Sequence, residues 1–186
     1  MSISLEFRRN LFHLTMGILI AFSILYVPRE VAIIGFGTGL LLCVAISERL
    51  KVSNLPIFDL FVDKMEREGK RPGSGVITFF IGSLIAVSVF STYIAFVSIL
   101  LVAIIDSFTV IIGKRFGKIK IYKDKSLRGF LAGFLMGLMI SVVLLPVHHA
   151  IIVCLAASLT ELYIPHDNIS IPVVSGTVLT LIGFLA

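Results

Sequence analysis

Long apolar runs separated by short polar segments constrain this chain more strongly than any other feature of its sequence. Of its residues, 58% are hydrophobic and only 15% are charged, which excludes an ordinary soluble domain. A bilayer core about 30 Å thick needs about 20 apolar residues per helix, and shorter runs fit with tilt or local thinning. We therefore expect residues 1–186 to form a single all-α integral membrane domain. Seven apolar runs are the expected transmembrane helices: Leu11–Val27, Val31–Ile46, Gly75–Phe90, Thr92–Ile112, Leu127–Leu145, His149–Ile164 and Ser170–Ala186.

The positive charge of the chain is unevenly distributed between its polar segments. With a cytoplasmic N-terminus and alternating helices, the cytoplasmic segments hold Arg8 and Arg9, the basic residues from Arg49 to Arg71, and those from Lys114 to Arg128. Only Arg29 lies elsewhere, so 15 of the 16 Lys and Arg residues sort to one side. Because positive charge resists translocation, we predict a multi-pass protein whose N-terminus and active-site face are cytoplasmic. The basic charge then belongs to a membrane face, which excludes nucleic acid as a partner.

The longest segment between the expected spans, residues 47–74, has a helical pattern of its own. Apolar side chains fall on one face of this segment, and acidic and basic residues fall elsewhere. The pattern predicts an amphipathic helix that lies on the cytoplasmic interface of the membrane. Its apolar face comprises Ile57, Phe58, Phe61, Val62 and Met65.

One acid, Asp106, lies inside an apolar run. An ionisable group within a span costs about 2.5 kcal/mol or more to insert, so it is a functional candidate by default. Asp106 lies seven residues before Gly113, which places it roughly 10 Å below the cytoplasmic surface at the rise of an α-helix. A structural ion pair with a nearby lysine, such as Lys114, is one explanation. We favour a metal ligand or a catalytic acid.

Further oxygen ligands are expected at the same face. Glu161 lies near the cytoplasmic end of the sixth span, and Asp167 and Asn168 follow it in a short segment. Capping of the last helix explains one of the latter two, but it does not explain Glu161. Carboxylate and amide oxygens suit Mg²⁺, which prefers hard ligands and leaves room for substrate phosphates. We therefore predict a Mg²⁺ site formed by Asp106, Asp167 and Asn168, with Glu161 as a further ligand or a catalytic group.

The segment that follows Asp106 concentrates basic residues and glycine. Ser126 is expected to cap the next helix, whose N-terminal N–H groups would then face an anion. Gly113 and Gly117 would let the backbone approach that anion closely. The segment does not match a Walker A loop, and retention of positive charge with anionic lipid binding is the alternative explanation. The predicted phosphate ligands are Gly113, Lys114, Arg115, Gly117, Lys118, Lys125 and Ser126.

The first helix contributes a third group of polar residues. Glu6, Arg9 and His13 are spaced so that they share one helical face. Snorkelling to the interface explains Arg8 and Arg9, but it suits His13 less well because His13 is already entering the span. We predict Arg9 as a phosphate ligand and His13, with Asp106 and Glu161, as a catalytic residue.

These residues resemble the CTP-dependent polyprenol and lipid kinases: dolichol kinase, phytol kinase and CTP-dependent diacylglycerol kinase. These enzymes are related to the phosphatidate cytidylyltransferases. The resemblance runs along nearly the whole chain and rests on EFRRNLFH at the start, Asp106 with Gly113 and Gly117, KDKSLRG, and TELYIPHDNISIPVVSG near the end. Thr109 stands where the family usually has Ala, and LRGF at 127–130 stands where it usually has x-Glu-Gly-Ser.

The resemblance implies transfer of the γ-phosphate of CTP, with a divalent metal, to the hydroxyl of a polyprenol-like or diacylglycerol-like lipid. The residues themselves indicate phosphoryl transfer by positioning and charge neutralisation, with His13 or Glu161 as the base for the hydroxyl. A cytidylyltransferase is one alternative, because it would use the same groups to attack the α-phosphorus and form a CDP-lipid. A small membrane transporter is the other, although its polar sites should lie near the midplane. The sequence allows a homodimer and does not name the lipid.

Overall fold

Helices make up nearly all of the structure. The computed structural model describes residues 3–52 and 73–183. A short antiparallel hairpin of β1 (Lys120–Tyr122) and β2 (Lys125–Ser126) joins two of the helices. The all-α prediction is confirmed, whereas the predicted interfacial helix over residues 57–65 lies outside the described residues. The described helices are α1 (Ile3–Ser23), α2 (Arg29–Val52), α4 (Ser74–Val89), α5 (Thr92–Phe116), α6 (Leu127–Leu144), α7 (Val147–Tyr163) and α8 (Asp167–Leu181).

Three of the described helices are long and apolar enough to cross a membrane. They are α5, α6 and the Arg29–Arg49 part of α2. Helices α4 and α7 are apolar but shorter, and the 15 residues of α8 reach about 22 Å, less than the hydrocarbon core of about 30 Å. The lengths and compositions of these helices are consistent with a membrane protein, but they do not support the predicted count of seven spans.

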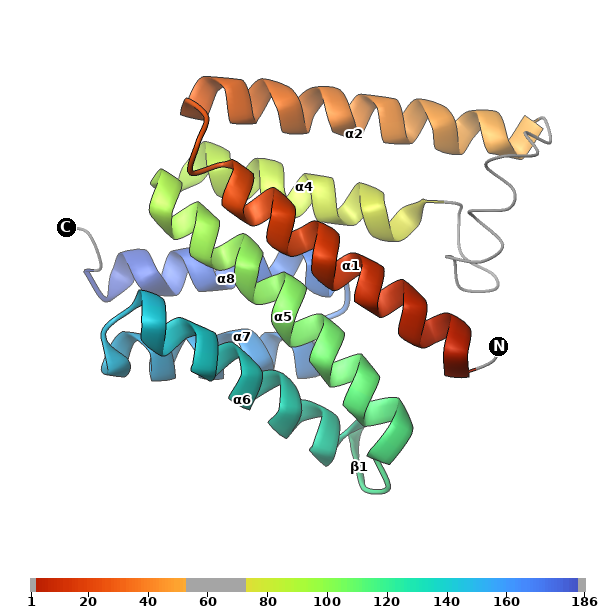
Figure 1. Ribbon diagram of the computed structural model, residues 1–186, viewed down its shortest axis with the longest axis vertical. Helices are drawn as coiled ribbons and strands as arrows, with labels where there is room; N and C mark the ends of the chain where they lie inside the picture. Colours follow the sequence, from red (N-terminus) through yellow and green to blue (C-terminus); the bar gives the residue numbers. More distant parts are fainter. Residues whose placement is uncertain (1–2, 53–72, 184–186) are drawn as a thin grey trace.

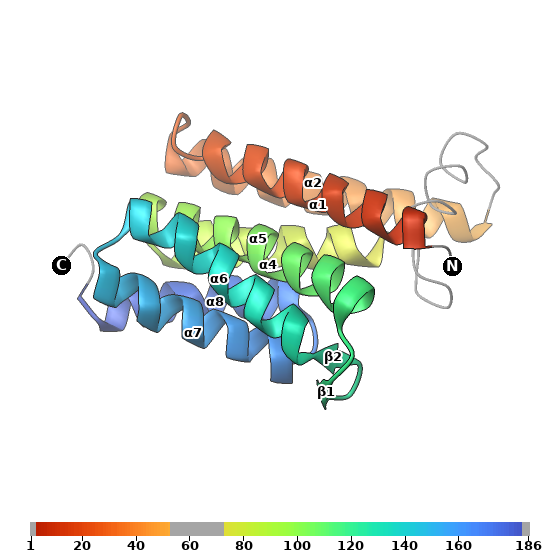
Figure 2. The same cartoon turned by 60° about the horizontal axis from the view of Figure 1, so that its bottom comes forward.

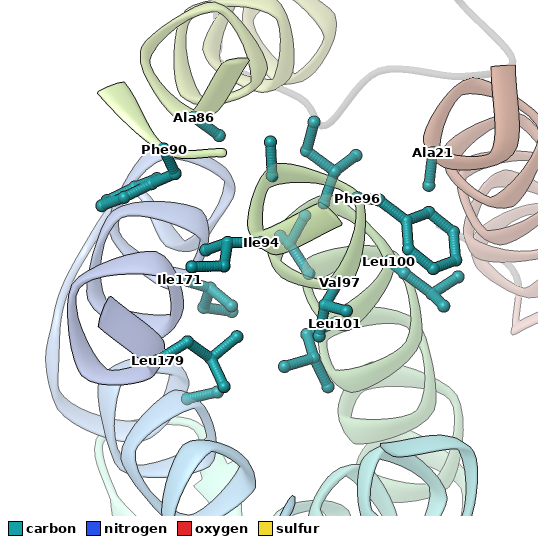
Figure 3. Close-up of a cluster of buried hydrophobic side chains, with 14 of the residues drawn as sticks. Ala21, Ala86, Phe90, Ile94, Phe96, Val97, Leu100, Leu101, Ile171 and Leu179 are labelled. Atoms are coloured by element: carbon teal, nitrogen blue, oxygen red, sulfur yellow. The ribbon is translucent and has the colours of Figure 1, made fainter. Parts of the chain in front are cut away.

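Helix α5 is the centre of the bundle. Every residue from Ile94 to Ile105 is buried, as expected for a helix that is apolar on all sides. It packs against α1, α4, α6 and α8. Figure 3 shows its side chains between Ala21 of α1 on one side and Ile171 and Leu179 of α8 on the other. The position of Asp106, which follows this buried stretch directly, is therefore set by packing on several sides.

Helix α6 lies close against α5 through glycines. Gly129, Gly133 and Gly137 recur at every fourth position, a spacing that predicts a close-packing face. All three are buried. A Cβ atom on Gly129 would lie 2.6 Å from the carbonyl oxygen of Thr109, and one on Gly137 would lie 3.0 Å from Ile105. The predicted packing face is confirmed, and it holds the start of α6 beside the last turns of α5.

Successive helices run in opposite directions. Most of the candidate functional residues therefore lie at one end of the bundle. Figures 1 and 2 show that α1, α4, α6 and α8 begin at this end and that α2, α5 and α7 finish there, with the hairpin at the end of α5. We call this the polar end and define it by residues 7–13, 73–78, 106–129 and 161–168. The turns that join α1 to α2, α4 to α5 and α6 to α7 lie at the opposite end.

Candidate metal centre

Three carboxylates from three helices meet at the polar end. Asp106 comes from just past the middle of α5, Glu161 from the last turn of α7 and Asp167 from the first turn of α8. One oxygen from each lies within 4.8 Å of the oxygens of the other two. The side chain of Glu161 is 1% exposed, that of Asp106 15% and that of Asp167 31%. The carboxylate cluster, as we call these three residues, therefore runs from the protein interior to solvent.

Lys125 is the basic residue that reaches the carboxylate cluster. Its Nζ donates a hydrogen bond to Oε1 of Glu161 and lies 3.8 Å from Oδ2 of Asp167. Burial by itself would lower the pKa of the Lys125 ammonium, but the nearby carboxylates of Glu161, Asp167 and Asp106 outweigh that effect and raise it. Lys125 therefore stays charged at neutral pH.

Asn168 connects the site to helix α4. Its side-chain Nδ2 donates to the carbonyl oxygen of Gly75 at 3.1 Å and contacts Oγ1 of Thr78 at 3.3 Å. Its backbone N–H donates to Oδ1 of Asp167 at 3.0 Å. The side-chain amide of Asn168 thus fixes the first turn of α8 against α4, and its backbone N–H orients Asp167. The side-chain Oδ1 of Asn168 is buried and has no hydrogen-bond partner among the described residues, so its role as a metal ligand stays a prediction.

The N-cap predicted for the last helix is wrong by one residue. The residue at the N-cap of α8 is His166, in the left-handed conformation at φ 63°, and its side chain makes no capping hydrogen bond. Asp167 is already helical, and it accepts the N–H of its neighbour Asn168. The sequence suggested that Asp167 or Asn168 caps this helix, but neither residue occupies the N-cap position. Helix capping therefore does not explain why a carboxylate lies at position 167.

His13 lies next to Asp106 on the side of helix α1. Its Nε2 is 3.8 Å from Oδ2 of Asp106, and its ring makes an edge contact with Phe79 of α4 at 5.4 Å between centroids. The nearby contact of Ser107 Oγ with the Asn10 carbonyl oxygen, at 3.3 Å, holds α1 against α5. His13 is partly buried at 24% side-chain exposure, and Arg9 lies one turn before it on the same helix.

The segment between α5 and α6 has a stronger structural role than the sequence indicated. Ser126 caps α6, as predicted, by accepting the N–H of Gly129 at 3.2 Å. Gly113 and Gly117 leave room for the Ser126 side chain, because a Cβ on Gly113 would lie 3.1 Å from Ser126 Oγ and one on Gly117 would meet the same side chain. Packing of this turn accounts for both glycines without a phosphate.

Other basic residues of this segment are exposed to solvent. Lys114, Arg115 and Lys118 are exposed at the polar end. Lys120 donates to the backbone carbonyl of Asp124 at 2.7 Å and so stays with the hairpin. Of the predicted phosphate ligands, Lys125 contacts Glu161 and Asp167, and Lys114, Arg115 and Lys118 are exposed.

The donor set of the carboxylate cluster fits a hard divalent cation. Three carboxylates provide the oxygen ligands that Mg²⁺ and similar ions prefer. Oε2 of Glu161 is buried and has no hydrogen-bond partner in the part of the chain that the structure describes. A buried carboxylate oxygen is normally hydrogen-bonded, because an unsatisfied one costs free energy. A cation bound between Asp106, Glu161 and Asp167 would satisfy it.

Sequence reasoning missed the contribution of helix α4. Gly82 lies so close to the first turn of α8 that a Cβ there would come 3.0 Å from the Cα of Ile169 and nearer still to the carbonyl oxygen of Asn168. Gly75 and Thr78 of the same helix receive the Asn168 amide. A glycine within an apolar run was the available signal for Gly82, and nothing in the sequence connects α4 with Asp167.

Fold and site together define an all-helical protein with apolar, membrane-compatible helices and a carboxylate cluster at one end. The chain is 35% identical over 160 residues to the uncharacterized protein MJ1137 of Methanocaldococcus jannaschii, a match that covers 84% of this chain and 81% of that protein. The chain therefore belongs to the same family as this archaeal protein. No family model matches the chain, and no solved structure matches it at a significant level.

Proposed function

We propose that the protein is a metal-dependent lipid kinase that transfers the γ-phosphate of CTP to the hydroxyl of a membrane lipid alcohol. The observation that carries the proposal is the convergence of Asp106, Glu161 and Asp167 within 4.8 Å of one another. This cluster lies at the end of an apolar bundle and beside a basic segment. A cation, a triphosphate and a lipid can therefore meet at one place. The choice of CTP and of the γ-phosphorus rests on the sequence resemblance.

The chain supplies most of what phosphoryl transfer needs through position and charge. Asp106, Glu161 and Asp167 would hold Mg²⁺, which when bound neutralises the oxygens of the triphosphate. Lys125 and the exposed Lys114, Arg115 and Lys118 would bind the phosphates from the solvent side. In the reaction the lipid oxygen forms a bond to the γ-phosphorus, the bond from that phosphorus to the β–γ bridging oxygen breaks, and CDP leaves.

His13 is the better placed of the two predicted bases. Glu161 is engaged by Lys125, whereas Nε2 of His13 faces Asp106 at 3.8 Å. The Nε2 of a neutral imidazole can accept a proton, so His13 would take the proton of the lipid hydroxyl as the new bond forms. The neighbouring residues Leu11, Phe12 and Met16 of α1 are exposed, so an alcohol could approach this helix from the bilayer.

The bundle would cross the membrane several times with its polar end in the cytoplasm. The clustering of ionisable groups at one end supports this arrangement over that of a transporter, whose polar sites should lie near the midplane. The exposed lysines at the polar end agree with retention of positive charge on the cytoplasmic side. The shorter helices α4, α7 and α8 would require a locally thinned bilayer.

Cysteine labelling tests this orientation. We expect Lys118→Cys to react with an impermeant thiol reagent only in inside-out membranes, and His148→Cys, at the opposite end, to react only from the exterior. Both positions are exposed. The background is a variant with both native cysteines, Cys43 and Cys154, replaced by Ala. Labelling of position 118 from the exterior would contradict the proposed orientation.

The reaction is tested with the purified full-length protein, Mg²⁺ and CTP labelled at the γ-phosphate, with either a polyprenol or diacylglycerol as acceptor. We expect the label to move into the organic phase as a lipid monophosphate, and unlabelled ATP to compete poorly. Release of labelled pyrophosphate together with cytidine in the lipid product would instead identify a cytidylyltransferase. Absence of turnover with a folded preparation and both classes of lipid would contradict an enzyme of either kind.

A further inference from the structure

The ammonium group of Lys125 lies where a bound cation would lie. It contacts Oε1 of Glu161 and is 3.8 Å from Oδ2 of Asp167, and both residues belong to the carboxylate cluster. An ammonium ion and a divalent metal compete for the same carboxylate oxygens, because each interacts with them through its positive charge. A metal ion that binds all three carboxylates would therefore weaken or break the contact between Lys125 and Glu161.

The attachment of Lys125 allows its side chain to move without disturbing the fold. The residue belongs to the short strand β2, and its neighbour Ser126 is fixed as the cap of α6. The Lys125 side chain is 30% exposed, and it is a long, flexible chain with a single charged group at its end. It can turn from the carboxylates toward solvent while the backbone stays in place.

Charge balance determines what would draw Lys125 away. If a metal alone replaced the ammonium at Glu161, Lys125 would lose its partner while still partly buried, which is unfavourable for a charged group. A metal that arrives with a triphosphate brings negative oxygens that can accept the ammonium in place of Glu161. The metal then satisfies the carboxylates, and the phosphate satisfies the lysine.

We propose that Lys125 is an exchangeable counter-ion of the carboxylate cluster, which makes the site accept a metal together with a nucleotide triphosphate in preference to the metal alone. This inference rests on the proposed function and adds an order of binding to it. Lys125 serves as a positioning residue in both states: it pairs with Glu161 and Asp167 before substrate arrives and binds phosphate afterwards. Competition from Lys125 also lowers the affinity of the carboxylate cluster for a metal ion that arrives without a nucleotide.

Direct measurement of Mn²⁺ binding tests this role without relying on turnover. The full-length protein in detergent is titrated with Mn²⁺ and the free ion is followed by electron paramagnetic resonance, with and without CTP. We expect Lys125→Gln to bind Mn²⁺ about tenfold more tightly than the unmodified protein when CTP is absent, because the competing charge is gone. Added CTP should tighten Mn²⁺ binding to the unmodified protein much more than to this variant. Lys123→Gln, at an exposed position of the same segment that is not among the predicted phosphate ligands, should behave like the unmodified protein.

Equal Mn²⁺ affinity of Lys125→Gln and Lys123→Gln would overturn the inference and leave Lys125 as a fixed ion-pair partner. If the unmodified protein nevertheless catalyses phosphoryl transfer, the proposed lipid-kinase function would still hold. If Lys125→Gln fails to fold, acylation of lysines in the unmodified protein is the second test. Mn²⁺ with CTP should change the acylation rate of Lys125 relative to that of the exposed Lys123 by several-fold, since the amine of Lys125 leaves Glu161. An unchanged ratio would overturn the inference.

Discussion

An Asp106→Asn variant is expected to fold normally and to lose about 1,000-fold in the rate of phosphoryl transfer. The substitution keeps the shape of the side chain and removes its charge, so packing of α5 should be preserved. A metal ion at a transferring phosphoryl group contributes several kcal/mol to catalysis, and each 1.4 kcal/mol corresponds to a factor of ten in rate. The measurements are the initial rate with γ-labelled CTP and the thermal unfolding temperature in detergent.

Asp124→Asn is the matched control for this variant. Asp124 is an exposed acid in the hairpin at the same end of the protein, and its hydrogen bond with Lys120 uses the backbone carbonyl rather than the carboxylate. The control should retain the full rate. If Asp106→Asn also retained its rate but unfolded at a lower temperature, Asp106 would be a structural ion-pair partner, the alternative that its sequence position left open.

A Gly82→Ala variant is expected to lose activity although the residue touches neither carboxylate nor substrate. The added Cβ would meet the backbone of Asn168 and lie 3.0 Å from the Cα of Ile169, so the first turn of α8 must shift and carry Asp167 with it. A displacement of about 1 Å in a catalytic group can reduce the rate about 100-fold. Crowding of this kind also costs about 1–3 kcal/mol of stability. Rate and unfolding temperature are measured together.

Gly75→Ala distinguishes displacement of α8 from a general effect of alanine in α4. The same methyl group at Gly75 would meet no heavy atom within 4 Å, and the carbonyl oxygen that receives the Asn168 amide is unaffected. This control should keep both its rate and its stability. Equal activity of Gly82→Ala and Gly75→Ala would show that the position of Asp167 does not matter for the reaction.

Much of the helical arrangement followed from the apolar runs alone. The break before Thr92 divides two adjoining runs, and the structure places the Ser91 side chain there as the cap of α5, accepting the N–H of Ile94. The start of α6 directly after Ser126 was equally predictable, because a serine before an apolar run is a local signal for a helix cap. Such predictions depend on a few neighbouring residues, which is why they succeeded.

The details of the site depended on contacts between distant segments, which local patterns do not encode. The sequence placed Asp106, Glu161 and Asp167 at one end but left open which lysine would pair with an acid. Nothing in the spacing connects Lys125 with Glu161. The hydrogen bond of Asn168 to the carbonyl oxygen of Gly75, 93 residues away, is likewise not encoded in any local pattern. The helix lengths support only three of the seven predicted spans, because an apolar run does not by itself set the length of its helix.

The apolar composition of the central helix α5 affects how Asp106 can be inserted into a membrane. In the arrangement proposed above, α5 must insert before its neighbours enclose it, with Asp106 facing hydrocarbon. On a biological insertion scale, the apolar residues from Ile94 to Ile105 together favour insertion by about 3–5 kcal/mol, while one aspartate near the middle of a helix opposes it by about 3 kcal/mol. The same side chains that later form the core thus offset the cost of delivering Asp106. Each apolar residue lost from this stretch would threaten biogenesis of the protein before it affected the finished fold.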